Sequence, residues 1–283
     1  MIKKLDGNEL LYPFFKSWLE KEQDTAQEFI KKARDALGIW LHPKYYQELP
    51  IIVPYAIRDS SCRRSGPNHT DEWGTPDIRG FFRDDNSLIK NIVNSMTVKS
   101  PTHWLKGLKG NGFTASHVWR EPSDYKENPI LASRRPELNS FVPNLVWLPK
   151  QIAKLTDREG SFAQHYLQAL SRHIYGKVEV KNGVIKLVND IWNLLPSPND
   201  LRNVALPDIN TIAFFDYQEK IVNKRKTKRI AAIRDACQDI LEFKSISTST
   251  LVTKRYRDGL PSISHDNLSK LKKWLDDYLN ALQ

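Results

Sequence analysis

The spacing of apolar residues predicts helices toward both ends of the chain. Apolar side chains recur at helical spacing over residues 8–40 and again over residues 161–175. Beyond the turn-forming residues near 196–200, the pattern predicts one long helix between residues 212 and 243. A last helix is predicted from residue 266 to residue 282. The C-terminal third of the chain is therefore expected to be helical.

Short apolar runs between turn-forming residues predict strands in the middle of the chain. Residues 51–53 are expected to form a short buried strand. Residues 113–119 and 144–148 are expected to form two further strands, separated by a polar loop that contains prolines. Pro149 stands where a helix often begins, and the pattern continues helically to residue 157.

These elements predict an α+β fold in three parts. An Asn-Gly pair among alternating apolar residues also indicates a β-hairpin over residues 178–188. A mixed N-terminal region (1–106) is followed by a strand–strand–helix unit with a further helix and the hairpin (107–195). A basic helical region (196–283) completes the chain.

The composition indicates a folded, basic protein. Hydrophobic residues make up 40% of the 283 residues, which is enough for a sizeable core. Lys and Arg outnumber Asp and Glu by 43 to 33, which gives a formal net charge of +10. Such a charge favours an acidic partner, most commonly nucleic acid and next an anionic membrane surface. No apolar stretch is long enough to predict a membrane span.

The number and spacing of the cysteines bear on metal binding, disulfides and the cellular compartment. The two cysteines, Cys62 and Cys237, lie far apart and form no Cys-x-x-Cys pair. This excludes a structural zinc site with cysteine ligands and argues against a disulfide framework, which indicates a reducing compartment. With no signal peptide recognisable at the N-terminus, a cytoplasmic protein is expected.

Two motifs in residues 113–157 carry a candidate chemistry. The first is Thr114-Ala115-Ser116-His117, a predicted strand that ends in histidine. The second is Asn144-Leu145-Val146-Trp147-Leu148-Pro149, a predicted strand that leads into a helix. In this order they resemble the HNH, or ββα-metal, nuclease superfamily. The resemblance implies that a small ββα-metal unit is embedded between the flanking regions.

The resemblance implies hydrolysis of phosphodiester bonds. This reaction needs a group that takes a proton from water near neutral pH, and histidine, with a pKa of about 6.5, is suited to that task. By resemblance, His117 is the general base and Asn144 orients the site. A divalent ion, Mg²⁺ or Mn²⁺, would stabilise the leaving oxygen.

The metal ligands expected from the resemblance depart from the family pattern. Ser116 stands where the family often has Asp or His, and Ala153 stands at the usual ligand position nine residues after Asn144. Asp157, one turn further along the predicted helix, is the substitute ligand because its carboxylate suits Mg²⁺ or Mn²⁺. His165 is a second candidate.

Basic side chains supply candidate contacts to a nucleic acid backbone. One pair lies in the loop between the two motif strands, and others lie in the predicted C-terminal helix and beyond it. The candidates are Arg134, Arg135, Lys224, Arg225, Lys228, Arg255 and Arg257.

The sequence therefore predicts a metal-dependent DNA endonuclease. Because so much chain lies outside the motif, a sequence-specific enzyme of the restriction type is expected, acting on double-stranded DNA as a homodimer. Two alternatives stay open. One is a non-catalytic nucleic-acid-binding protein that keeps a degenerate ββα unit. The other is a PD-(D/E)xK nuclease using Glu179 and Lys181, with Asp77 as the upstream acid.

Overall fold

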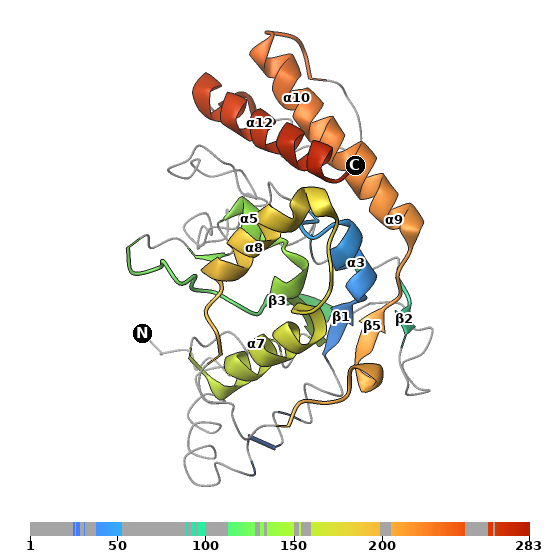
Figure 1. Cartoon of the computed structure of the whole chain (residues 1–283). Helices are drawn as coiled ribbons and strands as arrows, with labels where there is room; N and C mark the ends of the chain where they lie inside the picture. Colours follow the sequence, from blue (N-terminus) through green and yellow to red (C-terminus); the bar gives the residue numbers. More distant parts are fainter. Residues whose placement is uncertain are drawn as a thin grey trace, which may run out of the picture.

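A five-stranded mixed sheet lies at the centre of the fold in the computed structural model (Figure 1). Its strands lie in the order β2-β5-β1-β4-β3. The structure describes residues 25, 27–28, 31, 38–52, 89, 92–93, 96–99, 113–127, 131–132, 135–149, 153, 160–198, 205–246, 260–262 and 264–283. The chain thus has the expected α+β fold with a helical C-terminal region.

The middle strands of the sheet are short and wholly apolar. β1 (Ile39–Leu41) pairs in parallel with β5 (Ala213–Phe215) and antiparallel with β4 (Leu145–Pro149). All residues of β1 and β5 are buried, which is the pattern of strands covered on both faces. β2 (Val98–Lys99) and β3 (Phe113–His117) form the two edges. The five strands come from all three parts of the predicted division.

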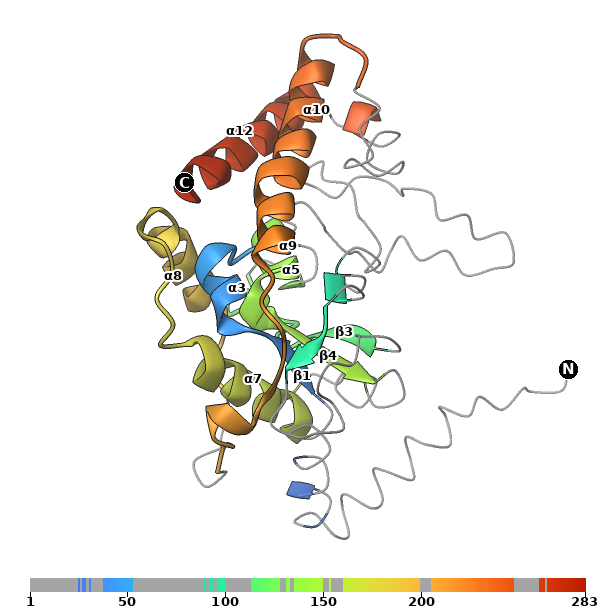
Figure 2. The same cartoon turned by 90° about the vertical axis from the view of Figure 1, so that its right-hand side faces the viewer.

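Helices lie along one side of this sheet and extend beyond one end of it (Figures 1 and 2). The α-helices are α3 (Pro43–Glu48), α5 (Pro136–Asn139), α7 (Phe162–Tyr175), α8 (Ile185–Leu194), α9 (Glu219–Asn223), α10 (Ala231–Leu241) and α12 (His265–Ala281). The 3-10 helices are η4 (Val142–Asn144), η6 (Asn182–Val184), η7 (Ile209–Thr211) and η9 (Leu260–Ser262). The π-helical segment η8 (Lys224–Ile230) joins α9 to α10 in one continuous helix.

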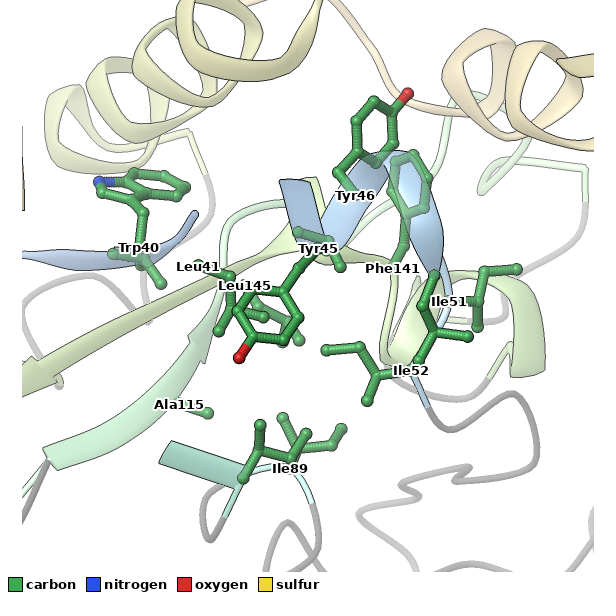
Figure 3. Packing of buried hydrophobic residues seen from close by; sticks show 14 of the residues in the cluster. Trp40, Leu41, Tyr45, Tyr46, Ile51, Ile52, Ile89, Ala115, Phe141 and Leu145 are labelled. Carbon is green, nitrogen blue, oxygen red and sulfur yellow. The ribbon is translucent and has the colours of Figure 1, made fainter. Parts of the chain in front are cut away.

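The hydrophobic core collects side chains from segments far apart in the sequence (Figure 3). Leu41 of β1, Tyr45 of α3 and Leu145 of β4 lie close together, and Tyr46 of α3 lies beside Phe141. Burial of aromatic and branched side chains on this scale is the main stabilising contribution to such a fold. The core therefore holds β1, α3 and β4 in one unit.

Helix α7 is docked to the sheet by side-chain hydrogen bonds to backbone carbonyls. Gln168 Nε2 donates to Val118 O (3.4 Å), Ser171 Oγ to Pro143 O (2.6 Å) and Tyr175 OH to Leu41 O (2.6 Å). The Ser161 hydroxyl accepts from Gln164 N at the start of the helix, a common N-cap arrangement. α7 thus binds the backbone just after β3, just before β4 and at the end of β1.

The C-terminal helix α12 packs along α10 (Figures 1 and 2) and is anchored to the body of the protein. The buried Tyr278 hydroxyl accepts from Ile51 N and donates to Ile51 O, both at 2.9 Å. Near the helix end, a Cβ atom on Gly183 would lie 2.2 Å from Ala281 O. Only glycine allows this close approach of η6 to α12.

Several sequence predictions are confirmed. α7 and α12 occupy the helices predicted over 161–175 and 266–282. β3 and β4 occupy the two strands predicted before and after the polar loop. The strand predicted over residues 51–53 is not formed as such: Ile51 makes an isolated bridge with Phe141, and residue 53 lies outside the described residues. Pro149, expected at a helix start, instead ends β4.

Three predicted elements are wrong. The helix expected up to residue 40 gives way to β1, because Ile39 and Trp40 pair with buried strands. The helix predicted over 212–243 begins only at Glu219, because residues 213–215 complete the sheet as β5. The hairpin predicted over 178–188 is replaced by η6 and α8, because the Asn-Gly turn is packed against the end of α12.

None of the helices in the described part of the chain is long and apolar enough to span a bilayer.

Replacing Tyr278 with Phe is expected to lower the free energy of unfolding by about 2–3 kcal/mol, because two buried backbone groups of Ile51 lose their partner. Urea denaturation measures this change. Tyr125→Phe is the matched control, since no hydrogen bond of the Tyr125 hydroxyl occurs within the described residues, and a change of about 0.5 kcal/mol or less is expected there. Equal losses in the two variants would contradict the assigned anchor.

Candidate active site

The two motif strands form one continuous antiparallel pair. β3 and β4 are in register from Phe113 opposite Pro149 to His117 opposite Leu145. His117 is therefore the last residue of β3, and Asn144 is the residue immediately before β4. The strand pairing brings these two residues, 27 positions apart, to the same end of the sheet.

Asn144 cross-links the backbone around His117. Its Oδ1 accepts from Trp119 N (2.7 Å), and its Nδ2 donates to Leu138 O (2.9 Å). Its backbone carbonyl accepts from Val118 N at 3.0 Å. Asn144 has no solvent-exposed surface, so these groups depend on one another for partners. The side chain thus fixes the chain after β3 to the loop that ends in α5.

The ring of His117 is oriented by the same loop. Nε2 lies 2.8 Å from the carbonyl oxygen of Asn139 at the end of α5. A carbonyl oxygen only accepts hydrogen bonds, so Nε2 carries the proton in the neutral ring. The lone pair of neutral His117 is therefore on Nδ1.

The surroundings of His117 favour its neutral form. Burial is the largest effect and lowers the pKa of the imidazole, and the positive charge of Arg120 lowers it further. The hydrogen bond to the Asn139 carbonyl and the nearby Asn139 side chain oppose these effects by favouring the protonated ring. Because the pKa stays below the ordinary value of 6.5, His117 is uncharged near neutral pH.

Asn139 is a site residue that the sequence analysis missed. It is 1% exposed, and its Oδ1 atom is buried without a hydrogen bond of normal geometry. Nothing in the sequence singles out this residue, because its role follows from the turn that brings the end of α5 under His117. Its carbonyl is one residue beyond Leu138 O, so His117 and Asn144 bind consecutive carbonyls of α5.

The residue two positions after His117 is held by a second cluster. The Arg172 guanidinium of α7 lies 5.8 Å from the Trp119 ring centroid and 5.1 Å from that of Trp192 in α8. Arg172 Nη2 also donates to Leu195 O at 2.6 Å, and Trp119 Nε1 donates to Pro196 O at 2.9 Å. These contacts tie α7 and α8 to the backbone that Asn144 also binds.

The described residues do not fit the expected metal centre. No three His, Cys, Asp or Glu side chains come together among them. Ser116 is buried and, as the neighbour of His117 in a strand, projects to the opposite face of the sheet. Ala153 is buried in the core. Asp157 lies outside the described residues. His165 is described in α7, where its Nδ1 atom is buried without a hydrogen-bond partner.

The predicted basic contacts fall into three groups. Arg135 is 3% exposed, and its guanidinium lies 2.6 Å from both carboxylate oxygens of Asp124. The positive charge of Arg135 is thus balanced by Asp124 inside the fold, which does not favour the predicted contact with a nucleic acid backbone. Lys224 and Lys228 are exposed on η8. Arg134, Arg255, Arg257 and the side chain of Arg225 lie outside the described residues.

Lys181, the lysine of the PD-(D/E)xK alternative, has partners within the fold. Lys181 Nζ lies 3.3 Å from Glu48 Oε2 and donates to Leu282 O at 3.1 Å, so its charge supports the docking of α12. Glu179 is exposed before η6, and the expected hairpin is absent there. Asp77 lies outside the described residues.

Comparison of the chain with known protein families, with curated proteins and with solved structures gave no match. The chemistry of the site therefore has to be argued from its own residues. What the geometry provides is a neutral, oriented imidazole with a lone pair on Nδ1, on a backbone fixed by a buried amide. Such a group is suited to take a proton from a bound water or alcohol.

Replacing Asn144 with Ala is expected to destabilise the protein by about 2–4 kcal/mol, because Trp119 N–H and Leu138 C=O lose their buried partner. Urea denaturation measures the loss. Asn193→Ala is the comparison, since the Asn193 side chain is not hydrogen-bonded within the described residues and lies on the surface of α8. A loss for Asn144→Ala no larger than that for Asn193→Ala would refute the cross-link.

The stability of the protein is expected to fall as the pH drops below about 6.5, because unfolded His117 gains a proton that the folded site disfavours. His42 has a lowered pKa for the same main reason, burial, and contributes in the same direction. His117→Gln removes only the His117 part. Urea denaturation at several pH values should therefore show a smaller loss below pH 6.5 for the variant than for wild type, and identical pH profiles would contradict the lowered pKa.

Proposed function

We propose that this protein is a DNA endonuclease of the HNH kind in which His117 is the general base. The observation that carries the proposal is the hydrogen bond from His117 Nε2–H to Asn139 O, which leaves the Nδ1 lone pair to act as a base. The sequence resemblance, the strand pairing of β3 with β4 and the position of Asn144 support the same proposal.

The proposed reaction adds water across a phosphodiester bond. Nδ1 of neutral His117 takes a proton from the attacking water as its oxygen bonds to phosphorus. The bond between phosphorus and the leaving oxygen breaks, and that oxygen takes a proton from solvent to give an alcohol. The His117 imidazolium then releases its proton to solvent. The Asn139 carbonyl stabilises the imidazolium that forms, since its hydrogen bond favours the charged ring.

The residues around His117 contribute position rather than further proton transfer. Asn144 holds Trp119 N and Leu138 O, so the strand end and the α5 loop keep a fixed spacing. A base held in this way needs little reorganisation at the moment of reaction. Because the described residues do not form the expected metal centre, the assay below tests separately whether cleavage needs a divalent ion.

The substrate class rests on charge and size. The net charge of +10 favours a polyanionic substrate. The large amount of chain outside β3 and β4 favours recognition of a particular sequence in double-stranded DNA. A homodimer matches the two-fold symmetry of a palindromic site. A non-catalytic nucleic-acid-binding protein is the competing proposal, favoured by Ser116 and Ala153 at the expected ligand positions.

The test is incubation of the purified protein with DNA of phage-genome length in Mg²⁺ and in Mn²⁺, with an EDTA arm. Wild type is expected to give discrete fragments, and His117→Ala is expected to lose at least a hundredfold in rate, on the order of a general-base contribution. His265→Ala, an exposed histidine at the start of α12, is the matched control and should cut like wild type.

Each result of this assay decides a separate part of the proposal. Cleavage that persists in EDTA removes the metal requirement but keeps His117. A smear in place of fragments keeps the nuclease and removes sequence specificity. If His117→Ala cuts as fast as wild type, the assigned base is wrong. Intact DNA that is nevertheless retarded on a gel by wild type supports the non-catalytic protein instead.

A further inference from the structure

One face of the helix formed by α9, η8 and α10 carries exposed lysines without counter-ions. Lys220, Lys224 and Lys228 are all exposed. Within the part of the chain that the structure describes, none of the three forms an ion pair. These three residues are called the lysine row below. Three positive charges at successive turns leave a strip of uncompensated positive potential on this helix.

The neighbouring helix α12 treats its lysines differently. Lys270 pairs with Asp266 at 2.6 Å, Lys272 with Asp276 at 2.8 Å and Lys273 with Asp277 at 2.7 Å. All three are i,i+4 pairs within the helix, and Arg234 of α10 also binds Asp276 at 2.9 Å. The lysines of α12 are thus neutralised locally, whereas those of the lysine row stay free for an external anion.

The π-helical winding of η8 keeps the lysine row straight. In an α-helix, a fourth residue passes one full turn, because a turn takes 3.6 residues. In a π-helix the turn is wider, so a fourth residue falls short of one full turn. The step from Lys220 to Lys224 therefore rotates slightly more than one turn about the helix axis, and the step from Lys224 to Lys228 rotates slightly less. The two deviations are opposite, which brings Lys228 back in line with Lys220.

The opposite face of this helix decides between two anionic partners. Val222, Ile230 and Ile233 are buried in the core, and Cys237 further along is buried as well. A helix that binds a membrane surface inserts an apolar face between the lipids. The apolar face of this helix is packed against α12 and the core, so only its charged face is available to a partner. A phosphodiester backbone requires no more than that.

We propose that the lysine row binds the phosphates of a nucleic acid backbone. The inference takes the nature of the partner from the proposed function and rests on it to that extent. It adds a contact surface remote in sequence from His117, made by lysines that position the nucleic acid without reading its bases. Lys220 is part of this surface, and the paired Arg135 is not.

The test compares two double variants that remove the same charge. Lys224→Gln/Lys228→Gln weakens the lysine row, and Lys270→Gln/Lys273→Gln removes two exposed but paired lysines of α12. Affinity for a fluorescent duplex is measured by anisotropy in EDTA, over a range of NaCl concentrations. The first pair is expected to reduce the slope of log K against log salt by about two, and to weaken binding by about 10- to 100-fold near 0.1 M salt.

The α12 pair is expected to change the slope by less than about 0.5, since its lysines are already neutralised. Equal effects of the two pairs would overturn the lysine row while leaving the His117 assay untouched. The proposal is also overturned if wild type does not bind duplex in EDTA. It is likewise overturned if Lys224 and Lys228 are needed for binding to phosphatidylserine vesicles but not for binding to duplex. If His117→Ala binds duplex as well as wild type but does not cleave it in the cleavage assay, binding by the lysine row is separate from the chemistry at His117.

Discussion

The buried side-chain amide of Asn144 is the interaction on which the candidate site depends. Its two hydrogen bonds join the backbone after β3 to the end of α5, and no solvent reaches them. Because a buried polar group without a partner costs more than an ordinary hydrogen bond contributes, breaking either hydrogen bond of Asn144 would destabilise this part of the fold. The Asn139 carbonyl that binds His117 is one residue beyond the Leu138 carbonyl that this cross-link holds.

The helices behind the site extend the same constraint outward. α7 binds carbonyls at three chain segments, and one of these belongs to Val118, directly after His117. Arg172 of the same helix covers Trp119, whose backbone is held by Asn144. The imidazole thus stands on a framework in which strand, loop and helix fix one another, and burial within it is what lowers the pKa of His117.

Charge is used in three ways in this basic protein. Arg135 is buried against Asp124 and serves the fold. The lysines of α12 are balanced by carboxylates one turn away and contribute little net potential. The lysine row keeps three exposed cations at successive turns without an ion pair among the described residues, on a helix whose apolar face is buried. The net charge alone does not distinguish these roles, because each depends on where the nearest carboxylate lies.

The sequence by itself determined the strongly periodic helices α7 and α12, the strands β3 and β4, and the placement of His117 and Asn144 at one end of these strands. These depend on local spacing and on neighbouring strands. Tertiary structure decided the rest. Residues 39–41 and 213–215 form strands because they pair with each other in parallel, although more than 170 positions of chain separate them. Lys181 pairs with Glu48 of a distant segment, and Arg135 is buried against Asp124. Asn139 joins the site in the same way, because packing and not spacing along the sequence sets these partners.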